Sequence, residues 1–222
     1  MSRPNLTGRL WYDAVFWSSF TYFTFGFSLR REGWKNMPKD GPVLVVSNHQ
    51  SMFDPVLAGL ASRRYLSYLA RSTLFENRYF AGLIRSLNAI PIDRNMGKDG
   101  IQNVLNGLSK GQCVLMFPEG ERTHDGTVQP LKPGVSLLIR KVTCPIVPMG
   151  ITGGFAAWSR FMKFPKASPL YLPPTDSAIA VSVGAPIEAG RYKGKDREWI
   201  LNDLHAAMAA QFEAAKRLQR KS

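Results

Sequence analysis

The chain has 222 residues, enough for one substantial domain, and its hydrophobic content of 45% is ordinary for a globular protein. It carries 29 Lys and Arg against 16 Asp and Glu, a formal net charge of +13, which favours polyanionic partners such as an anionic membrane surface or an acidic protein. The two cysteines, Cys113 and Cys144, adjoin apolar runs and are interpreted as buried thiols of a reducing compartment, which excludes a disulfide framework.

The first predicted element is an aromatic segment at residues 10–29. It holds nine aromatic rings and a single formal charge, Asp13. It has neither the aliphatic run nor the small-residue cleavage site of a signal peptide. Four arginines flank it: Arg3, Arg9, Arg30 and Arg31.

About 20 residues could just cross a bilayer, but Trp and Tyr favour the headgroup level. We therefore prefer an interfacial helix, with residues 1–32 as a membrane-associating helical segment and residues 33–222 as the catalytic domain. The alternative is an aromatic helix that packs on the core of the domain.

The rest of the chain alternates predicted strands and helices. Strands are predicted at residues 43–47, 65–70, 90–92, 113–117 and 145–151, with an edge strand at 178–183. Helices are predicted at residues 55–61, 76–87, 98–108, 133–141 and 196–220. This alternation is typical of an α/β domain with a mostly parallel sheet flanked by helices. The Pro- and Gly-containing stretch 161–174 predicts a loop near the site entrance or on the surface.

His49 and Asp54 lie five residues apart in "SNHQSMFDP", directly after the first apolar strand. Five residues of continuous helix turn by about 500°, so the two side chains can meet only across a strand end, a turn and a helix start. Pro55 favours that helix start, which makes Asp54 an N-cap and His49 a polar turn residue in a purely structural interpretation. The functional interpretation is a carboxylate that orients an imidazole, whose other nitrogen then acts as general base.

Three more motifs end or interrupt predicted strands: "FPEGERT", "IPIDR" and "IVPMG". The first offers Glu119, Gly120 and Arg122, the second offers Arg94, and the third places Pro148 inside an apolar strand. Ligand sites in open parallel sheets lie beyond the carboxyl ends of strands, where these charged residues are predicted. The forked guanidinium donors suit a phosphate, although surface ion pairs explain each charged motif equally well when taken alone.

The order and spacing of "NHQSMFD", "IPIDR", "FPEGERT" and "IVP" resemble the glycerolipid acyltransferase family, which includes the bacterial 1-acyl-glycerol-3-phosphate acyltransferases. The likeness runs from about residue 41 to residue 151. It implies transfer of a fatty acyl group from acyl-CoA or acyl carrier protein to the hydroxyl of a lysophospholipid, above all 1-acyl-glycerol-3-phosphate, giving phosphatidic acid. It implies no metal or other cofactor, and a location at the cytoplasmic face of the cell membrane.

The resemblance also implies a role for each motif residue. His49 would be the general base and Asp54 its orienting partner. Four residues would hold the phosphorylated acceptor: Arg94, Glu119, Gly120 and Arg122. Pro148 would help to shape the acyl-donor side. This chain departs from the family in having Arg71 where lysine is frequent and Glu121 where a small residue such as Thr is frequent. A carboxylate beside a phosphate is unfavourable unless it points away.

Other functions stay open from the sequence. The acceptor could be glycerol-3-phosphate or a non-phosphorylated lysolipid, or the chain could be a non-catalytic membrane-binding protein. A nucleic-acid partner would fit the charge, but no recognition motif is present and none is predicted. His124 and His205 lack metal-ligand spacing and are assigned surface or packing roles.

Overall fold

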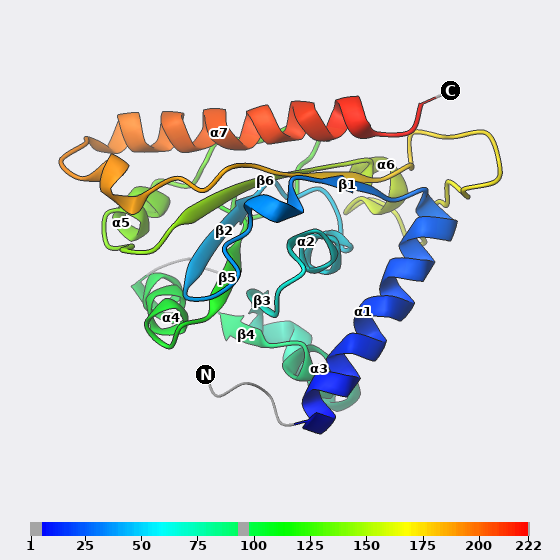
Figure 1. Cartoon of the computed structure of the whole chain (residues 1–222), viewed down its shortest axis with the longest axis horizontal. Helices are drawn as coiled ribbons and strands as arrows, with labels where there is room; N and C mark the ends of the chain where they lie inside the picture. The colour runs from blue at the N-terminus through cyan, green and yellow to red at the C-terminus, as the bar shows by residue number, and fades with distance from the viewer. Residues whose placement is uncertain (1–5, 93–97, 222) are drawn as a thin grey trace.

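Seven strands form one mixed sheet in the computed structural model, which describes residues 6–92 and 98–221 (Figure 1). In chain order they are β1 (Arg30–Glu32), β2 (Val43–Ser47), β3 (Leu66–Arg71), β4 (Ala89–Ile92), β5 (Cys113–Met116), β6 (Ile146–Thr152) and β7 (Ala180–Val183). Their order in space is β1-β7-β6-β2-β5-β3-β4, and only β6 and β7 pair antiparallel.

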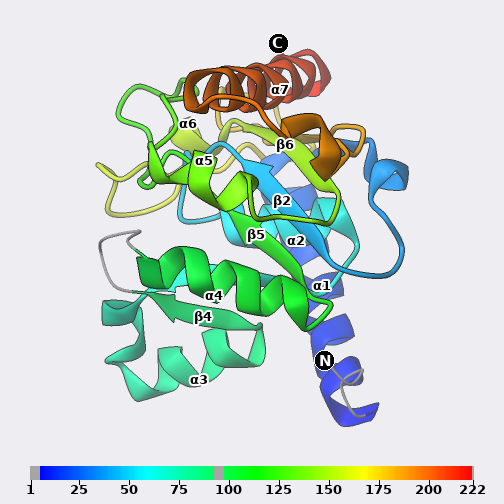
Figure 2. The same cartoon turned by 90° about the vertical axis from the view of Figure 1, so that its left-hand side faces the viewer.

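Helices cover both faces of the sheet (Figures 1 and 2). One face packs against α1 (Leu6–Phe27) and α2 (Asp54–Ser62), and the other against α4 (Lys98–Ser109), α5 (Gly134–Ile139) and α7 (Arg197–Leu218). Two shorter helices are α3 (Arg78–Ser86), beside β4, and α6 (Gly154–Trp158), directly after β6. Each face has its own apolar core, and the fully buried strand β2 contributes its apolar side chains alternately to the two cores.

The register of the three central strands brings their carboxyl ends together. Val46 of β2 aligns with Met116 of β5 on one side and with Pro148 of β6 on the other. The segments that follow these strands therefore begin side by side at one edge of the sheet. This edge is where ligand sites of doubly wound sheets lie, and it holds His49 and the "FPEG" motif.

The predicted α/β class and mostly parallel sheet are confirmed, and the predicted strands and longer helices lie within a few residues of the observed ones. The helix predicted at residues 76–87 is confirmed as α3, which a 3₁₀ turn, Ser72–Phe75, precedes. One prediction was wrong: the strand predicted at the edge, β7, is flanked by β6 and by β1. The edge strand on that side, β1, has three residues of which two are arginines, so it has no apolar periodicity to detect.

Helix α1 has two apolar faces. Phe23 and Phe27 are buried against α2 and the sheet, with Phe16 and Phe20 packed beside them. The opposite face leaves large apolar side chains exposed: Leu6, Leu10, Trp11, Trp17, Tyr22 and Phe25. Half of the aromatic segment thus completes the core, while the other half lacks a cover within the described residues. None of the helices among those residues is both long enough and apolar enough to span a bilayer.

Helix α7 lies directly on the backbone of β6 at Gly150. A Cβ atom built at this glycine would lie 2.1 Å from the amide nitrogen of Phe212. Real Cβ contacts never come so close, so any side chain at this position would push α7 away from the sheet. The long C-terminal helix can therefore pack this closely on the sheet only because residue 150 has no side chain.

We expect Gly150→Ala to destabilise the fold by at least about 1–3 kcal/mol, the usual cost of overpacking a core. The matched control is Gly82→Ala in α3, where a Cβ meets nothing within 4 Å. Alanine is the better helix former, so this change should stabilise by up to about 1 kcal/mol. Urea unfolding midpoints measure both, and equal midpoints for the two variants would contradict the seating of α7.

Candidate active site

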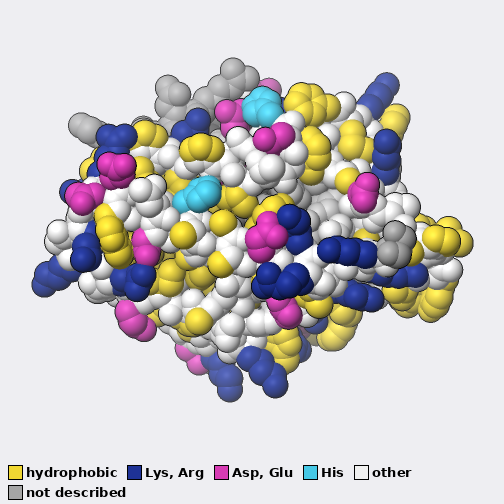
Figure 3. Space-filling view, turned by 90° about the horizontal axis from the view of Figure 1, so that it is seen from above, with side chains coloured by type: hydrophobic (Ala, Val, Ile, Leu, Met, Phe, Trp, Pro, Cys, Tyr) yellow, Lys and Arg dark blue, Asp and Glu magenta, His cyan; other side chains and the backbone are white. Residues whose placement is uncertain are grey.

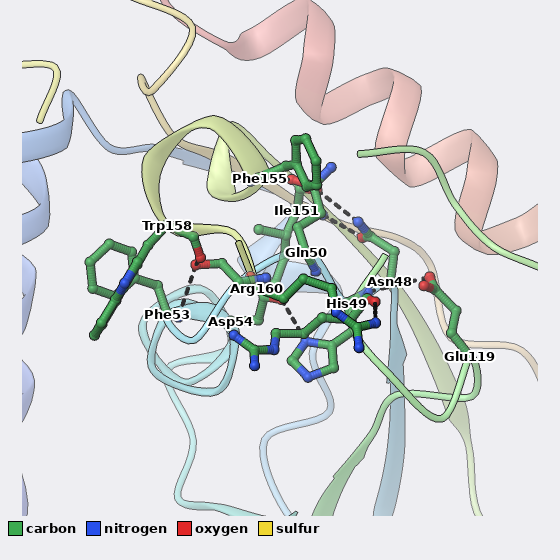
Figure 4. Close-up of polar contacts among 12 residues, drawn as sticks. Asn48, His49, Gln50, Phe53, Asp54, Glu119, Ile151, Phe155, Trp158 and Arg160 are labelled. Carbon is green, nitrogen blue, oxygen red and sulfur yellow. Dashed lines mark hydrogen bonds and ion pairs between the residues drawn. The ribbon is translucent and has the colours of Figure 1, made fainter. Parts of the chain in front are cut away.

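His49 and Asp54 meet across the turn that follows β2. The imidazole Nδ1 lies 2.7 Å from Asp54 Oδ2, and the Asp54 side chain is 0% exposed whereas that of His49 is 19% exposed. A carboxylate oxygen can only accept, so Nδ1 carries the hydrogen and Nε2 keeps its lone pair. The contact leaves Nε2 of this partly exposed side chain as the candidate base nitrogen (Figure 4).

The structural interpretation of the sequence predicted Asp54 as the N-cap of α2, and this prediction is wrong. Asp54 is the first residue of the helix, Phe53 occupies the cap position, and no side chain caps the helix. The carboxylate instead points back into the turn, where Oδ2 accepts from the backbone amides of Gln50 at 2.6 Å and Ser51 at 2.7 Å. One oxygen therefore closes the turn and holds the imidazole at the same time.

The other side of the imidazole is covered by Phe117, which follows β5. The two rings stack with centroids 4.0 Å apart and planes 12° from parallel. Beyond this stack, the carbonyl oxygen of His49 accepts from the amide of Thr123 at 2.7 Å. The "FPEG" segment is thus fixed to the histidine turn by a ring contact and by a backbone hydrogen bond.

Glu119 is the second buried carboxyl group of the site, 2% exposed. Its Oε1 accepts from the His49 amide at 3.3 Å, while Oε2 is buried without a recorded partner among the described residues. Burial raises the pKa of this side chain from 4.5 to about 8, and the nearby carboxyl of Asp54 adds to the shift. At neutral pH without substrate, Glu119 is therefore mostly protonated.

Arg160 reaches the site from the segment after α6, a feature that the sequence did not indicate. Its Nη1 lies within 3.0 Å of Glu121 Oε2, 3.1 Å of the Arg122 carbonyl oxygen and 2.8 Å of His124 Nε2. The hydrogen bond from Arg160 is the main reason that the pKa of Glu121 is lowered. Glu121, the carboxylate that departs from the family pattern, is thus paired with Arg160, which belongs to none of the sequence motifs.

Two amide side chains connect the turn to the strand and helix beyond it. The Asn48 side chain exchanges two hydrogen bonds with the backbone of Ile151, at 2.9 and 2.8 Å, and so extends the pairing of β2 with β6. Gln50 donates to the Gly126 carbonyl at 2.6 Å and accepts from the Phe155 amide at 3.3 Å. Figure 4 shows these contacts gathered around His49.

Gly154 lets α6 approach the dyad. A Cβ built there would lie 3.2 Å from Asp54 Oδ1, an oxygen that is buried with no recorded partner among the described residues. The "GG" pair at the end of β6 is the sequence signal for this close approach, and it can be recognised only once the packing is known.

The remaining predicted site residues are placed differently. Gly120 adopts φ 79° beneath the stem of Lys132. Arg122 is half-buried at the rim of the site. Pro148 is buried within β6, aligned with Val46, so it lies in the body of the sheet. Arg94 lies outside the described residues. The acceptor and donor roles assigned to these residues stay predictions.

The fold and the site together define a class of protein: a doubly wound α/β domain with a buried carboxylate–imidazole pair at the carboxyl end of its central strand. A family model described as Acyltransferase matches residues 28–152, which is more than half of the chain and includes every motif residue named above. The chain belongs to this acyltransferase family.

Curated relatives agree with this assignment. The chain is 28% identical over 131 residues to the 1-acyl-sn-glycerol-3-phosphate acyltransferase of Bacillus subtilis, covering 58% of this chain and 65% of that protein. It is 33% identical over 118 residues to the Streptococcus pneumoniae protein of the same name, covering 52% and 43%. It thus spans less than two thirds of either relative. Among solved structures, the 1-acyl-sn-glycerophosphate acyltransferase PlsC of Thermotoga maritima shares the fold with a TM-score of 0.75 at 22% identity, covering 93% of this chain and 78% of that one.

The raised pKa of Glu119 predicts a pH-dependent stability. Between about pH 4.5 and 8 the folded chain binds a proton at Glu119 that the unfolded chain has released, so this side chain makes stability fall as pH rises through that window. Glu119→Gln keeps the size and the Oε1 acceptor but cannot ionise. We expect the variant to gain stability relative to the parent from pH 4.5 to 8, by on the order of a few kcal/mol.

Urea unfolding of both proteins without substrate, at several pH values, measures this difference. Above pH 8 the difference should level off, because Glu119 of the parent is then ionised in both states. A difference that stays constant from pH 4.5 to 8.5 would mean that the carboxyl group titrates normally despite its burial.

Proposed function

We propose that this chain is an O-acyltransferase that moves a fatty acyl group from an acyl thioester to the free hydroxyl of a lysophospholipid, with 1-acyl-glycerol-3-phosphate as acceptor and phosphatidic acid as product. The observation that carries the proposal is the 2.7 Å contact between His49 Nδ1 and the buried Asp54 carboxylate. The membership in the acyltransferase family and the names of the bacterial relatives support the substrate class.

The chemistry requires a base and no enzyme nucleophile, because a thioester is already activated. His49 Nε2 removes the proton of the acceptor hydroxyl as its oxygen attacks the thioester carbonyl. The tetrahedral intermediate then collapses, the ester forms, the carbon–sulfur bond breaks, and the imidazolium returns the proton to the departing thiolate. Asp54 stabilises the imidazolium that exists between the two proton transfers.

We assign the acceptor phosphate to Arg122 at the rim of the site and, from the family resemblance alone, to Arg94. A guanidinium binds phosphate through charge-assisted, directional hydrogen bonds. Because Arg160 compensates Glu121, the carboxylate of Glu121 repels a phosphate at this rim less than an unpaired one would. Acyl-CoA and acyl carrier protein are both acidic, so the net charge of +13 suits either donor.

The membrane is the expected source of the acceptor, and the exposed apolar face of α1 is our proposed contact with it. Its large side chains would enter the headgroup region, with Arg30 at its carboxyl end. Arg31 does not fit the flanking role expected from the sequence, because its guanidinium lies 4.5 Å from the centroid of the Phe20 ring and donates to the carbonyl of Leu60. It is used to hold α1 on the core.

We expect His49→Ala to lower acyl transfer by about 10²–10⁴ while leaving the fold intact, since this is the usual contribution of a general base. The matched control is His205→Ala, a histidine of α7 outside the site. The assay uses purified chain, acyl-CoA or acyl carrier protein as donor, and a panel of lysolipids. Near-normal turnover by the folded His49 variant would remove the general-base role and the proposed function with it.

A second variant tests the acceptor. We expect Arg122→Ala to lower kcat/KM for a phosphorylated acceptor by roughly ten- to a hundredfold, the value of a hydrogen bond to a charged group, with little change in the KM of the donor. Arg140→Ala on the far face, where Arg140 donates to the carbonyl of Lys195, is the control. Unchanged acceptor kinetics would instead favour an acceptor without a phosphate.

A further inference from the structure

The segment of residues 160–172, the aromatic loop, is fixed at its base. Ser168 is fully buried and its amide donates to the carbonyl of Gly26, while the amide of Leu170 donates to Phe25, both at 2.9 Å. Arg220, beyond α7, donates to the Leu170 carbonyl at 2.6 Å. The loop is therefore held at its base by the backbone of the end of α1 and by the side chain of Arg220, without any partner.

The tips of this anchored loop are apolar and exposed. Four large side chains project from it: Phe161, Phe164, Tyr171 and Leu172. Phe164 is 70% and Tyr171 is 83% exposed, although the neighbouring amides of Lys166 and Leu170 donate to the carbonyls of Ala157 and Phe25. Lys163 and Lys166 lie between them, and neither has a recorded ion pair with the described residues. At the right-hand end of Figure 3, where the chain terminates, hydrophobic side chains stand beside Lys and Arg in this way.

The aromatic loop joins two regions already described. At one end, the rings of Tyr171 and Phe25 have centroids 6.0 Å apart, which makes the loop continuous with the exposed face of α1. At the other end, the Phe161 ring lies 6.1 Å from that of His124, and the neighbouring Arg160 binds the segment that follows the "FPEG" motif. The loop thus has a ring contact with α1 at one end and a ring contact with the segment beside the active-site rim at the other.

We propose that the aromatic loop is a second membrane-docking element, which inserts its aromatic tips into an anionic bilayer and holds the active-site rim at the lipid surface. Docking by the loop does not depend on catalysis. The further statement, that the loop places lipid acceptor beside His49 without its leaving the bilayer, rests on the proposed function.

Composition and rigidity favour a bilayer as the occupant. Aromatic rings with interspersed lysines are the side chains that settle at the headgroup level of anionic membranes. Since the loop is already ordered, insertion costs little conformational entropy. The exposed acids on α1, near the loop and on the segment around His124 include Asp13, Asp125, Asp176 and Glu121, of which Glu121 is paired with Arg160. An acidic protein is the competing occupant, and the experiment separates the two.

The test is sedimentation of the full chain with vesicles of phosphatidylcholine, with and without phosphatidylglycerol. Phe164→Ser with Tyr171→Ser should weaken binding to both kinds of vesicle by about tenfold or more, because each buried aromatic side chain contributes over 1 kcal/mol. Lys163→Gln with Lys166→Gln should weaken binding to the anionic vesicles alone, by roughly thirtyfold, at about 1 kcal/mol for each charge. The control is Leu137→Ser on α5, another exposed apolar side chain (55%) remote from the loop, which should bind like the parent.

Parent-like vesicle binding by both loop variants would overturn the proposal. So would a loss of activity that appears only with acyl carrier protein as donor and leaves vesicle binding unchanged, since the partner would then be that protein. The His49→Ala chain should bind vesicles like the parent, which separates docking from the proposed function. Retained activity of the loop variants on a dispersed short-chain lysolipid, together with lost activity on vesicles, is the supporting result.

Discussion

The buried Oδ2 atom of Asp54 is the point on which the site depends. It accepts from His49 Nδ1 and from the amides of Gln50 and Ser51, all within 2.7 Å. A fully buried carboxylate is costly without such partners, and here the partners are the turn itself and the imidazole. The interaction that makes the burial tolerable is therefore the same one that fixes the tautomer of His49, so the turn cannot form properly without also orienting the base.

The rest of the site is arranged around that turn by the three central strands. Phe117 and Glu119 arrive from β5, Ile151 and Gly154 from β6, and each has a direct contact with the turn or with Asp54. The two carboxyl groups have different surroundings. Asp54 accepts from three donors within 2.7 Å, whereas the hydrogen bonds that Glu119 accepts from backbone amides do not offset its burial, and its pKa is raised to about 8. A neutral acid beside a charged dyad avoids placing two negative charges in one buried site.

The same packing divides the aromatic residues of α1 into two groups with different uses. The inner group, with Phe23 and Phe27, belongs to the core, and the outer group is exposed over the whole length of the helix. The end of α1 contacts the aromatic loop, and the other end of the loop contacts the segment at the rim of the active site. The exposed apolar side chains of α1 and of the loop therefore lie on the side of the molecule that includes this rim. A lipid substrate would be met by such a surface.

The sequence by itself determined the fold class, most element positions and the His49–Asp54 pair. Apolar runs and helical spacing are local signals, and a histidine and an aspartate five residues apart can be evaluated within one turn. Tertiary structure decided the rest. Three-residue β1 is a strand only because β7 is beside it, and α6 can approach the Asp54 carboxyl group only because Gly154 has no side chain. Arg160 joins Glu121 from 39 residues away, and the pKa of Glu119 depends on burial by several elements. Such long-range contacts have no local pattern, because they are set by which strands become neighbours in the sheet.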